Sequence, residues 1–145
     1  MITDKDERKH FIKECKDTDY YRKKIVECDE KLEVLNAQLE GVSSPTVKEV
    51  IYENARNPYH ERKNILLTEE EKIVAEKNSW ESRVNYVEEK LKLITNERDL
   101  NLITDLYIKE MNHEVVAYKY HYASRSALYK HVNKVLDKIL KESTM

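Results

Sequence analysis

The stretch NHEVVAYKYHYASRSALYKHVNKVLDKIL, residues 112–140, decides the fold of this chain because it fits either a strand or two helices. Every second residue over 116–122 is apolar or aromatic, as in a β-strand, but no partner strand is found nearby. As a helix, the same run places Val116 and Tyr120 on one face, and Asn112 precedes it as an N-cap. We therefore predict two helices with a short turn between them.

These two predicted helices have the character of a DNA-binding helix–turn–helix. The helices of that motif meet at a steep angle and need a small residue where they approach, and Ala117 occupies that position. Tyr122 and Ala123 would form the turn, after His121 at a position where glycine is usual. Ser124 would cap the second helix. Its apolar face would consist of Leu128, Val132, Val135 or Leu136, and Ile139.

The other face of the second helix carries cations and hydrogen-bond donors, which bind phosphates and the edges of guanine. We therefore predict the following DNA-binding residues: Lys119 from the first helix, and Ser124, Arg125, Ser126, Tyr129, Lys130, His131 and Lys134 from the second. Two other interpretations stay open. The cations could form only a solvated helix face, and Tyr129 could pack against the third helix, which is predicted to follow Asn96.

Two segments before this stretch carry the apolar spacing of a coiled coil, alternately four and three residues. The first series is Tyr21, Ile25, Cys28, Leu32, Leu35, Leu39 and Val42, and the second is Trp80, Val84, Val87, Leu91 and Ile94. We predict helices over about residues 5–40 and 69–95. They would pair as a hairpin within one chain or, alternatively, one of them would pair with a second copy. Asn96 would cap a third helix.

The segment between the two long helices is predicted to be a connector at about residues 41–67. Gly41 would end the first helix in a left-handed conformation, and Pro58 disfavours helix at the residue before it. Thr68 would cap the second helix, with Glu71 completing a capping box three residues later.

The composition also favours an all-α fold. Charged residues make up 37% of the chain and glycine occurs once, which favours helices over turns. We therefore predict a long helical hairpin, or coiled coil, over residues 1–95. A helix–turn–helix domain would follow over residues 96–145.

The distribution of charge and the absence of known motifs limit the function. Residues 112–141 hold six lysines and arginines against two acids in a chain of net charge −2, which suggests a polyanionic partner. No nucleophile elbow, HExxH motif or Gly-rich loop is present, so we predict neither an enzyme nor a cofactor. Cys15 and Cys28 lack the spacing of metal ligands, and no apolar run could span a bilayer. We therefore predict no metal, no membrane association and a cytoplasmic location.

The run YASRSALYK, residues 122–130, resembles the recognition helix of phage-encoded transcriptional regulators of the ArpU and RinA type. That helix is similar to region 4 of sigma factors, with the pattern Y-x-S-x-S/T-φ-Y-R/K, in which φ is apolar. The matching residues are Tyr122, Ser124, Ser126, Leu128, Tyr129 and Lys130, with Ala127 standing before Leu128. A charged N-terminal helix, a GVSSP connector and a second long helix precede this run, in the same order as in those regulators.

The resemblance implies a sequence-specific transcriptional regulator of phage late genes, which binds double-stranded DNA in the bacterial host cell. The coiled coil would form a homodimer or engage the host RNA polymerase. Two alternatives remain. One is a DNA-packaging subunit similar to small terminase subunits, which form rings, and the other is a coiled-coil adaptor that binds only proteins. DNA binding at low salt would separate the adaptor from the other two.

Overall fold

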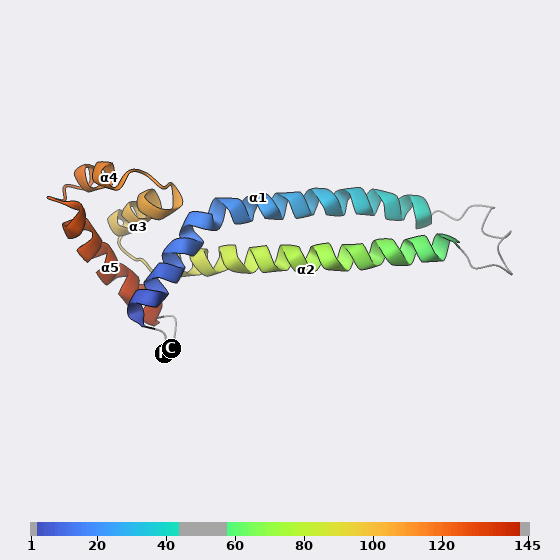
Figure 1. Ribbon diagram of the computed structural model, residues 1–145, viewed down its shortest axis with the longest axis horizontal. Helices are drawn as coiled ribbons and strands as arrows, with labels where there is room; N and C mark the ends of the chain where they lie inside the picture. Colours follow the sequence, from blue (N-terminus) through green and yellow to red (C-terminus); the bar gives the residue numbers. More distant parts are fainter. Residues whose placement is uncertain (1–2, 44–57, 143–145) are drawn as a thin grey trace. The chain divides into compact units, whose positions relative to one another are not determined.

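The computed structural model describes residues 3–43 and 58–142, and every regular element within them is helical (Figure 1). In chain order the elements are α1 (Asp4–Ser43), α2 (Pro58–Lys92), α3 (Glu97–Ile103), the π-helix η2 (Thr104–Ile108), α4 (His113–Lys119) and α5 (Arg125–Glu142). The predicted all-α fold is confirmed. The strand interpretation of residues 116–122 is wrong, because most of that run belongs to α4.

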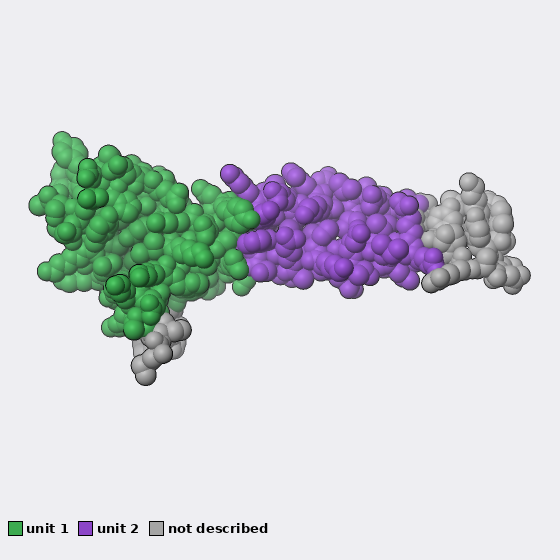
Figure 2. Space-filling view, in the orientation of Figure 1, with its two compact units in different colours: residues 1–22, 82–145 green, residues 23–81 purple. Residues whose placement is uncertain are grey.

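The helices form two compact units (Figure 2). Unit 1 combines residues 1–22 with residues 82–145, and unit 2 consists of residues 23–81. α1 and α2 each contribute to both units, whereas α3, α4 and α5 belong to unit 1 alone. The compact unit that holds the predicted helix–turn–helix therefore also includes the beginning of α1 and the end of α2.

Unit 2 is a pair of helices, with the second half of α1 beside the first part of α2 (Figure 1). The predicted seam residues Cys28 and Leu35 are buried in it, together with Leu66. Lys77 binds Asp29 across the pair, with its Nζ 2.5 Å from Oδ1 of the carboxylate. α1 and α2 thus pack together as the long helical hairpin that the two apolar seams predict.

The bounds of the two long helices differ from the prediction: α1 ends at Ser43 rather than about residue 40, and α2 runs from Pro58 to Lys92 rather than over about 69–95. Gly41 lies inside α1 without a positive φ, so the predicted left-handed cap is wrong. α2 already begins at Pro58, because proline fits the first turn of a helix, where its missing N–H is not needed. Thr68 is not a cap, since its hydroxyl donates to the Asn64 carbonyl at 2.9 Å within α2. The rest of the predicted connector, residues 44–57, lies outside the described residues.

Unit 1 encloses one apolar core to which α1, α2 and all the later helices contribute. Its most deeply buried side chains are Phe11, Cys15, Val87, Leu102, Ile103, Leu106, Val116, Leu128, Val132, Leu136 and Ile139. On α5, Leu136 rather than Val135 completes the buried face, which settles the alternative that the sequence left open. Since one core joins these helices, α4 and α5 are held in place by neighbours on several sides.

Candidate nucleic-acid interface

The turn between α4 and α5 is closed by backbone hydrogen bonds around one left-handed residue. The amide of Tyr122 donates to the carbonyl of Ala117 at 2.8 Å. The amide of His121 donates to the carbonyl of Tyr118 at 3.1 Å, and the two bonds together form a Schellman motif. His121 has a φ of 63°, the conformation for which glycine is usual, at the position where the sequence suggested it. The two predicted helices are thus joined by a short turn that is closed by hydrogen bonds of the backbone.

Side-chain caps fix the starts of the helices on both sides of this turn. Oδ1 of Asn112 accepts from the amide of Glu114 at 2.9 Å at the start of α4. Oγ of Ser124 accepts from the amide of Ala127 at 3.2 Å at the start of α5. Both caps confirm the sequence predictions, as does the cap of α3 by Asn96.

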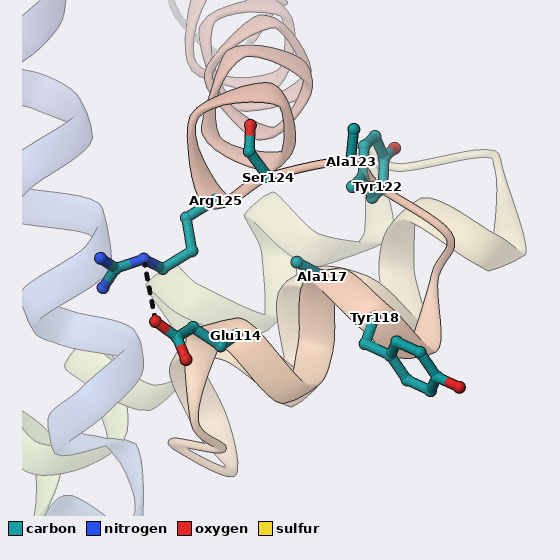
Figure 3. A pocket seen from close by; sticks show the side chains of 7 residues that line it. All are labelled: Glu114, Ala117, Tyr118, Tyr122, Ala123, Ser124 and Arg125. Carbon is teal, nitrogen blue, oxygen red and sulfur yellow. Dashed lines mark ion pairs between the residues drawn. The ribbon is translucent and has the colours of Figure 1, made fainter.

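α4 and the start of α5 face each other across an open notch of about 400 Å³ (Figure 3). The notch is lined by Glu114, Ala117, Tyr118, Tyr122, Ala123, Ser124 and Arg125. Ala117 is buried, as the close approach of the two helices requires. Tyr118 extends away from the notch and is 85% exposed, more than any other large apolar side chain of the described residues.

A buried carboxylate in the π-helix η2 holds the end of α4. Asp105 is only 3% exposed, and its Oδ2 accepts from Nζ of Lys119 at 2.8 Å and from the hydroxyl of Tyr120 at 2.7 Å. Burial opposes ionisation of Asp105, but these two hydrogen bonds outweigh it and hold the pKa of the carboxyl below its ordinary value. The hydrogen bond to Asp105 likewise raises the pKa of Lys119. Lys119, a predicted DNA-binding residue, thus has its ammonium committed to an internal ion pair.

A second contact holds the turn from the side of α3. The guanidinium of Arg98 donates to the carbonyl of Tyr120. It also lies over the rings of Tyr120 and Tyr122, 5.9 and 5.6 Å from their centroids. Because Arg98 and Asp105 reach the turn from α3 and η2, the relative placement of α4 and α5 depends on these preceding elements.

Two of the predicted DNA-binding residues on α5 face neighbouring helices. The Tyr129 hydroxyl contacts Nδ1 of His113, and their rings meet edge to face with centroids 5.5 Å apart. Burial, followed by nearby cations, lowers the pKa of His113. Nε2 of His131 lies 2.7 Å from Oδ1 of Asp99 on α3. Tyr129 and His131 therefore make contacts inside unit 1. Tyr129 meets His113 of α4, whereas the sequence interpretation had placed it against the third helix.

The remaining predicted residues of α5 lie on its open side. Arg125, Ser126, Lys130 and Lys134 are all exposed. Lys130 and Lys134, together with Lys138, form one exposed row at spacings of four residues, which we call the lysine ridge. Within residues 3–43 and 58–142, no acid forms an ion pair with any of its three ammonium groups. Lys138 was not among the predicted site residues, although the same four-residue spacing could have identified it.

The far end of α5 is fixed to the start of α1. Nη1 of Arg8 lies 2.6 and 2.9 Å from the two carboxylate oxygens of Asp137, and both side chains are largely buried. Nζ of Lys141 lies 3.8 Å from Oδ2 of Asp4. Asp137 and Lys141 are therefore paired within unit 1, unlike the three lysines of the ridge.

Comparisons of the chain with models of protein families, with curated proteins and with solved structures gave no match. The described helices include none that is long and apolar enough to cross a membrane. No three His, Cys, Asp or Glu side chains in that part of the chain converge in a way that could hold a metal ion. The features that bear on function are therefore the turn between α4 and α5 and the exposed side chains beside it.

Proposed function

We propose that this chain is a sequence-specific DNA-binding transcriptional regulator, in which the first turns of α5 enter the major groove. The observation that carries the proposal is the lysine ridge on the open side of α5, directly after a Schellman turn and a short α4. In a helix–turn–helix, the second helix buries one face and presents the other to the bases. α5 buries Leu128 and Val132 and exposes Arg125 and Lys130, which is the division that such a helix requires.

The charges of α5 also favour a polyanion. The helix carries five lysines and arginines against two acids, and one of those acids, Asp137, is already paired with Arg8. Ammonium groups that are exposed and unpaired can displace the counterions of DNA without first breaking an internal ion pair. Arg125 and Ser126 in the first turn would contact base edges and phosphates, and the lysine ridge would contact the DNA backbone.

The resemblance of residues 122–130 to regulators of the ArpU and RinA type supports a more specific role. On that basis the chain would act on phage late genes in the cytoplasm of a bacterial host. A single module of this size binds DNA weakly, so a second copy or a contact with host RNA polymerase would supply the remaining affinity. The hairpin of unit 2 is the part of the chain available for such a contact.

DNA binding by charge-matched variants tests the proposal. The double variant Lys130→Ala with Lys134→Ala removes two cations of the ridge, and Lys63→Ala with Lys72→Ala removes two exposed lysines of unit 2 as the control. Fluorescence anisotropy would use labelled DNA that flanks the chain's own gene, a scrambled duplex and several salt concentrations. We expect the native DNA to be preferred by the wild type. We also expect the slope of log K against log salt to fall by about two in the ridge variant only.

Three outcomes would redirect the assignment. Equal loss of binding in both double variants would show that only net charge matters and would remove α5 as the binding element. Selective DNA binding by a closed ring of subunits, measured by light scattering, would favour a DNA-packaging subunit over a regulator. No binding of any DNA at low salt would leave the coiled-coil adaptor.

A further inference from the structure

In the notch between α4 and α5, one acid lies beside the cation that is the first residue of the proposed DNA-binding helix. Glu114 and Arg125 are the one acid and the one cation among the described residues that line it. Oε1 of Glu114 lies 3.8 Å from Nε of Arg125, and Figure 3 shows the two side chains extending toward each other from the two helices. We propose that Glu114 is a specificity-determining residue, which orients Arg125 toward a guanine and weakens binding to other DNA. This inference rests on the proposed function.

The geometry of the pair leaves the two terminal nitrogens of Arg125 free to bind a base. A guanidinium binds guanine through two parallel N–H groups, which donate to O6 and N7 of the base in the major groove. Glu114 lies on the Nε side of the guanidinium, so the two terminal nitrogens remain available to donate to O6 and N7 of guanine. Arg125 is the first residue of α5, which is where a recognition helix contacts base edges.

The exposure of the pair excludes a large contribution to stability. The Glu114 side chain is 73% exposed and that of Arg125 is 59% exposed, and ion pairs so exposed contribute little to folding. The backbone at Glu114 is held independently, because its amide donates to the cap Asn112 at 2.9 Å. Replacing the Glu114 side chain should therefore leave α4 intact, and a change in DNA binding would come from the carboxylate itself.

The negative charge of Glu114 should lower the affinity for DNA of any sequence and raise the preference for guanine. On a surface that meets DNA, a carboxylate repels the phosphate backbone at every sequence and lowers non-specific affinity. At a site with guanine in the correct position, the same carboxylate keeps Arg125 in one orientation and so reduces the conformational freedom lost on binding. Removal of the charge should therefore strengthen binding to random DNA and weaken discrimination for guanine. A residue that only stabilised the fold would not produce these two opposite changes.

The test first requires the preferred site, obtained by selection of bound duplexes from a random library with the full-length chain. Each guanine of that site is then replaced in turn by 7-deazaguanine, which lacks the N7 acceptor. We expect one replacement to weaken the wild type about 5- to 100-fold, the range of one bidentate contact. Arg125→Ala should be insensitive to the same replacement. In Glu114→Gln, the loss of affinity caused by 7-deazaguanine should be about three- to tenfold smaller than in the wild type. The affinity of Glu114→Gln for random DNA should be about two- to fivefold higher than that of the wild type at low salt.

Glu89→Gln is the matched control, because Glu89 is an exposed acid of unit 1 on α2 and the change alters net charge equally. It should raise the affinity for random DNA less than Glu114→Gln and leave the penalty for 7-deazaguanine unchanged. A double-mutant cycle between Glu114→Gln and Arg125→Ala should show coupling only with the guanine-containing site.

Each alternative outcome has a distinct meaning. An unchanged 7-deazaguanine penalty in Glu114→Gln, with selective binding by the wild type, would overturn this inference and leave the proposed function standing. The same holds if Glu89→Gln reproduces both effects, since net charge would then suffice. A wild type that binds no DNA would remove the proposed function and this inference with it.

Discussion

The two compact units differ in how their helices are held together. In unit 1, six helical elements share a core, and side chains such as Leu106 and Leu128 have no exposed surface. In unit 2, two helices pack along a seam, and Val34 and Ile65 remain 58% and 60% exposed. A core that excludes water from many sides fixes side-chain positions more tightly than a seam between two helices. The proposed DNA-binding surface lies on unit 1, whose side chains are the more deeply buried.

The largest expected difference between the units comes from truncation of buried and exposed apolar side chains. Leu128→Ala in α5 should lower the free energy of unfolding by about 3 kcal/mol, because it leaves a cavity in the core of unit 1. Val34→Ala in the hairpin should change it by less than about 0.5 kcal/mol, since most of that side chain already meets solvent. Urea denaturation followed by circular dichroism would measure both. Equal effects of the two substitutions would mean that unit 1 is not the better-packed unit.

The second prediction concerns the polar contact beneath the turn. Asp105→Asn should lower the free energy of unfolding by about 1–3 kcal/mol, because Lys119 loses its partner and the bond from Tyr120 weakens.

The contact of Asp105 should also make the free energy of unfolding depend on pH. The pKa of Asp105 is lower in the folded chain than its ordinary value of 3.8, so ionised Asp105 stabilises the fold above that value. This stability is lost as the pH falls through the lower, folded pKa. The wild type should therefore lose stability below about pH 4 more steeply than Asp105→Asn, as denaturation at several pH values would show. Parallel curves for the two proteins would argue against an ionised Asp105.

The sequence was sufficient for features that depend on residues close together in the chain. The four-and-three spacing identified both long helices, and Asn112 and Ser124 were recognised as caps because each bonds an amide only two or three residues away. At His121 the sequence indicated only a position where glycine is usual, and the structure shows that this residue is left-handed. Local geometry decides all these features, and local geometry is what spacing and residue type report.

The sequence was insufficient where distant residues compete for the same side chain. Lys119 has the appearance of a DNA-binding cation, but Asp105, 14 residues before it, pairs with its ammonium. His131 lies 32 residues from its partner Asp99. The start of α2 was predicted too late, because Pro58 was taken as an interruption when it is the first residue of the helix. Spacing along the chain carries no information on such long-range pairs, which depend on how α3 and η2 pack against α4 and α5.

The third prediction compares one ion pair from each unit. Arg8→Ala in unit 1 should lower the free energy of unfolding by about 1 kcal/mol, because Arg8 binds both oxygens of Asp137 and the pair is largely buried. Lys77→Ala in unit 2 should lower it by about 0.5 kcal/mol or less, since the Asp29 carboxylate is 52% exposed. Denaturation at low and high salt measures the effects of both substitutions. Added salt should reduce the effect of Lys77→Ala more strongly than the effect of Arg8→Ala. A larger effect in unit 2 would contradict the ranking of the two units.

The smallest expected effect has the opposite sign and concerns the only glycine of the chain. Gly41 lies inside α1 in unit 2, its φ is not positive, and a Cβ at this position would meet no atom within 4 Å. Gly41→Ala should therefore raise the free energy of unfolding by about 0.5–1 kcal/mol, because alanine loses less backbone freedom than glycine on entering a helix. Thermal unfolding would detect the shift, with Ala37→Gly, one turn earlier on the same exposed helix, as the reverse control. A loss of stability in Gly41→Ala would show that α1 does end at Gly41 with a left-handed residue, as the sequence alone had suggested.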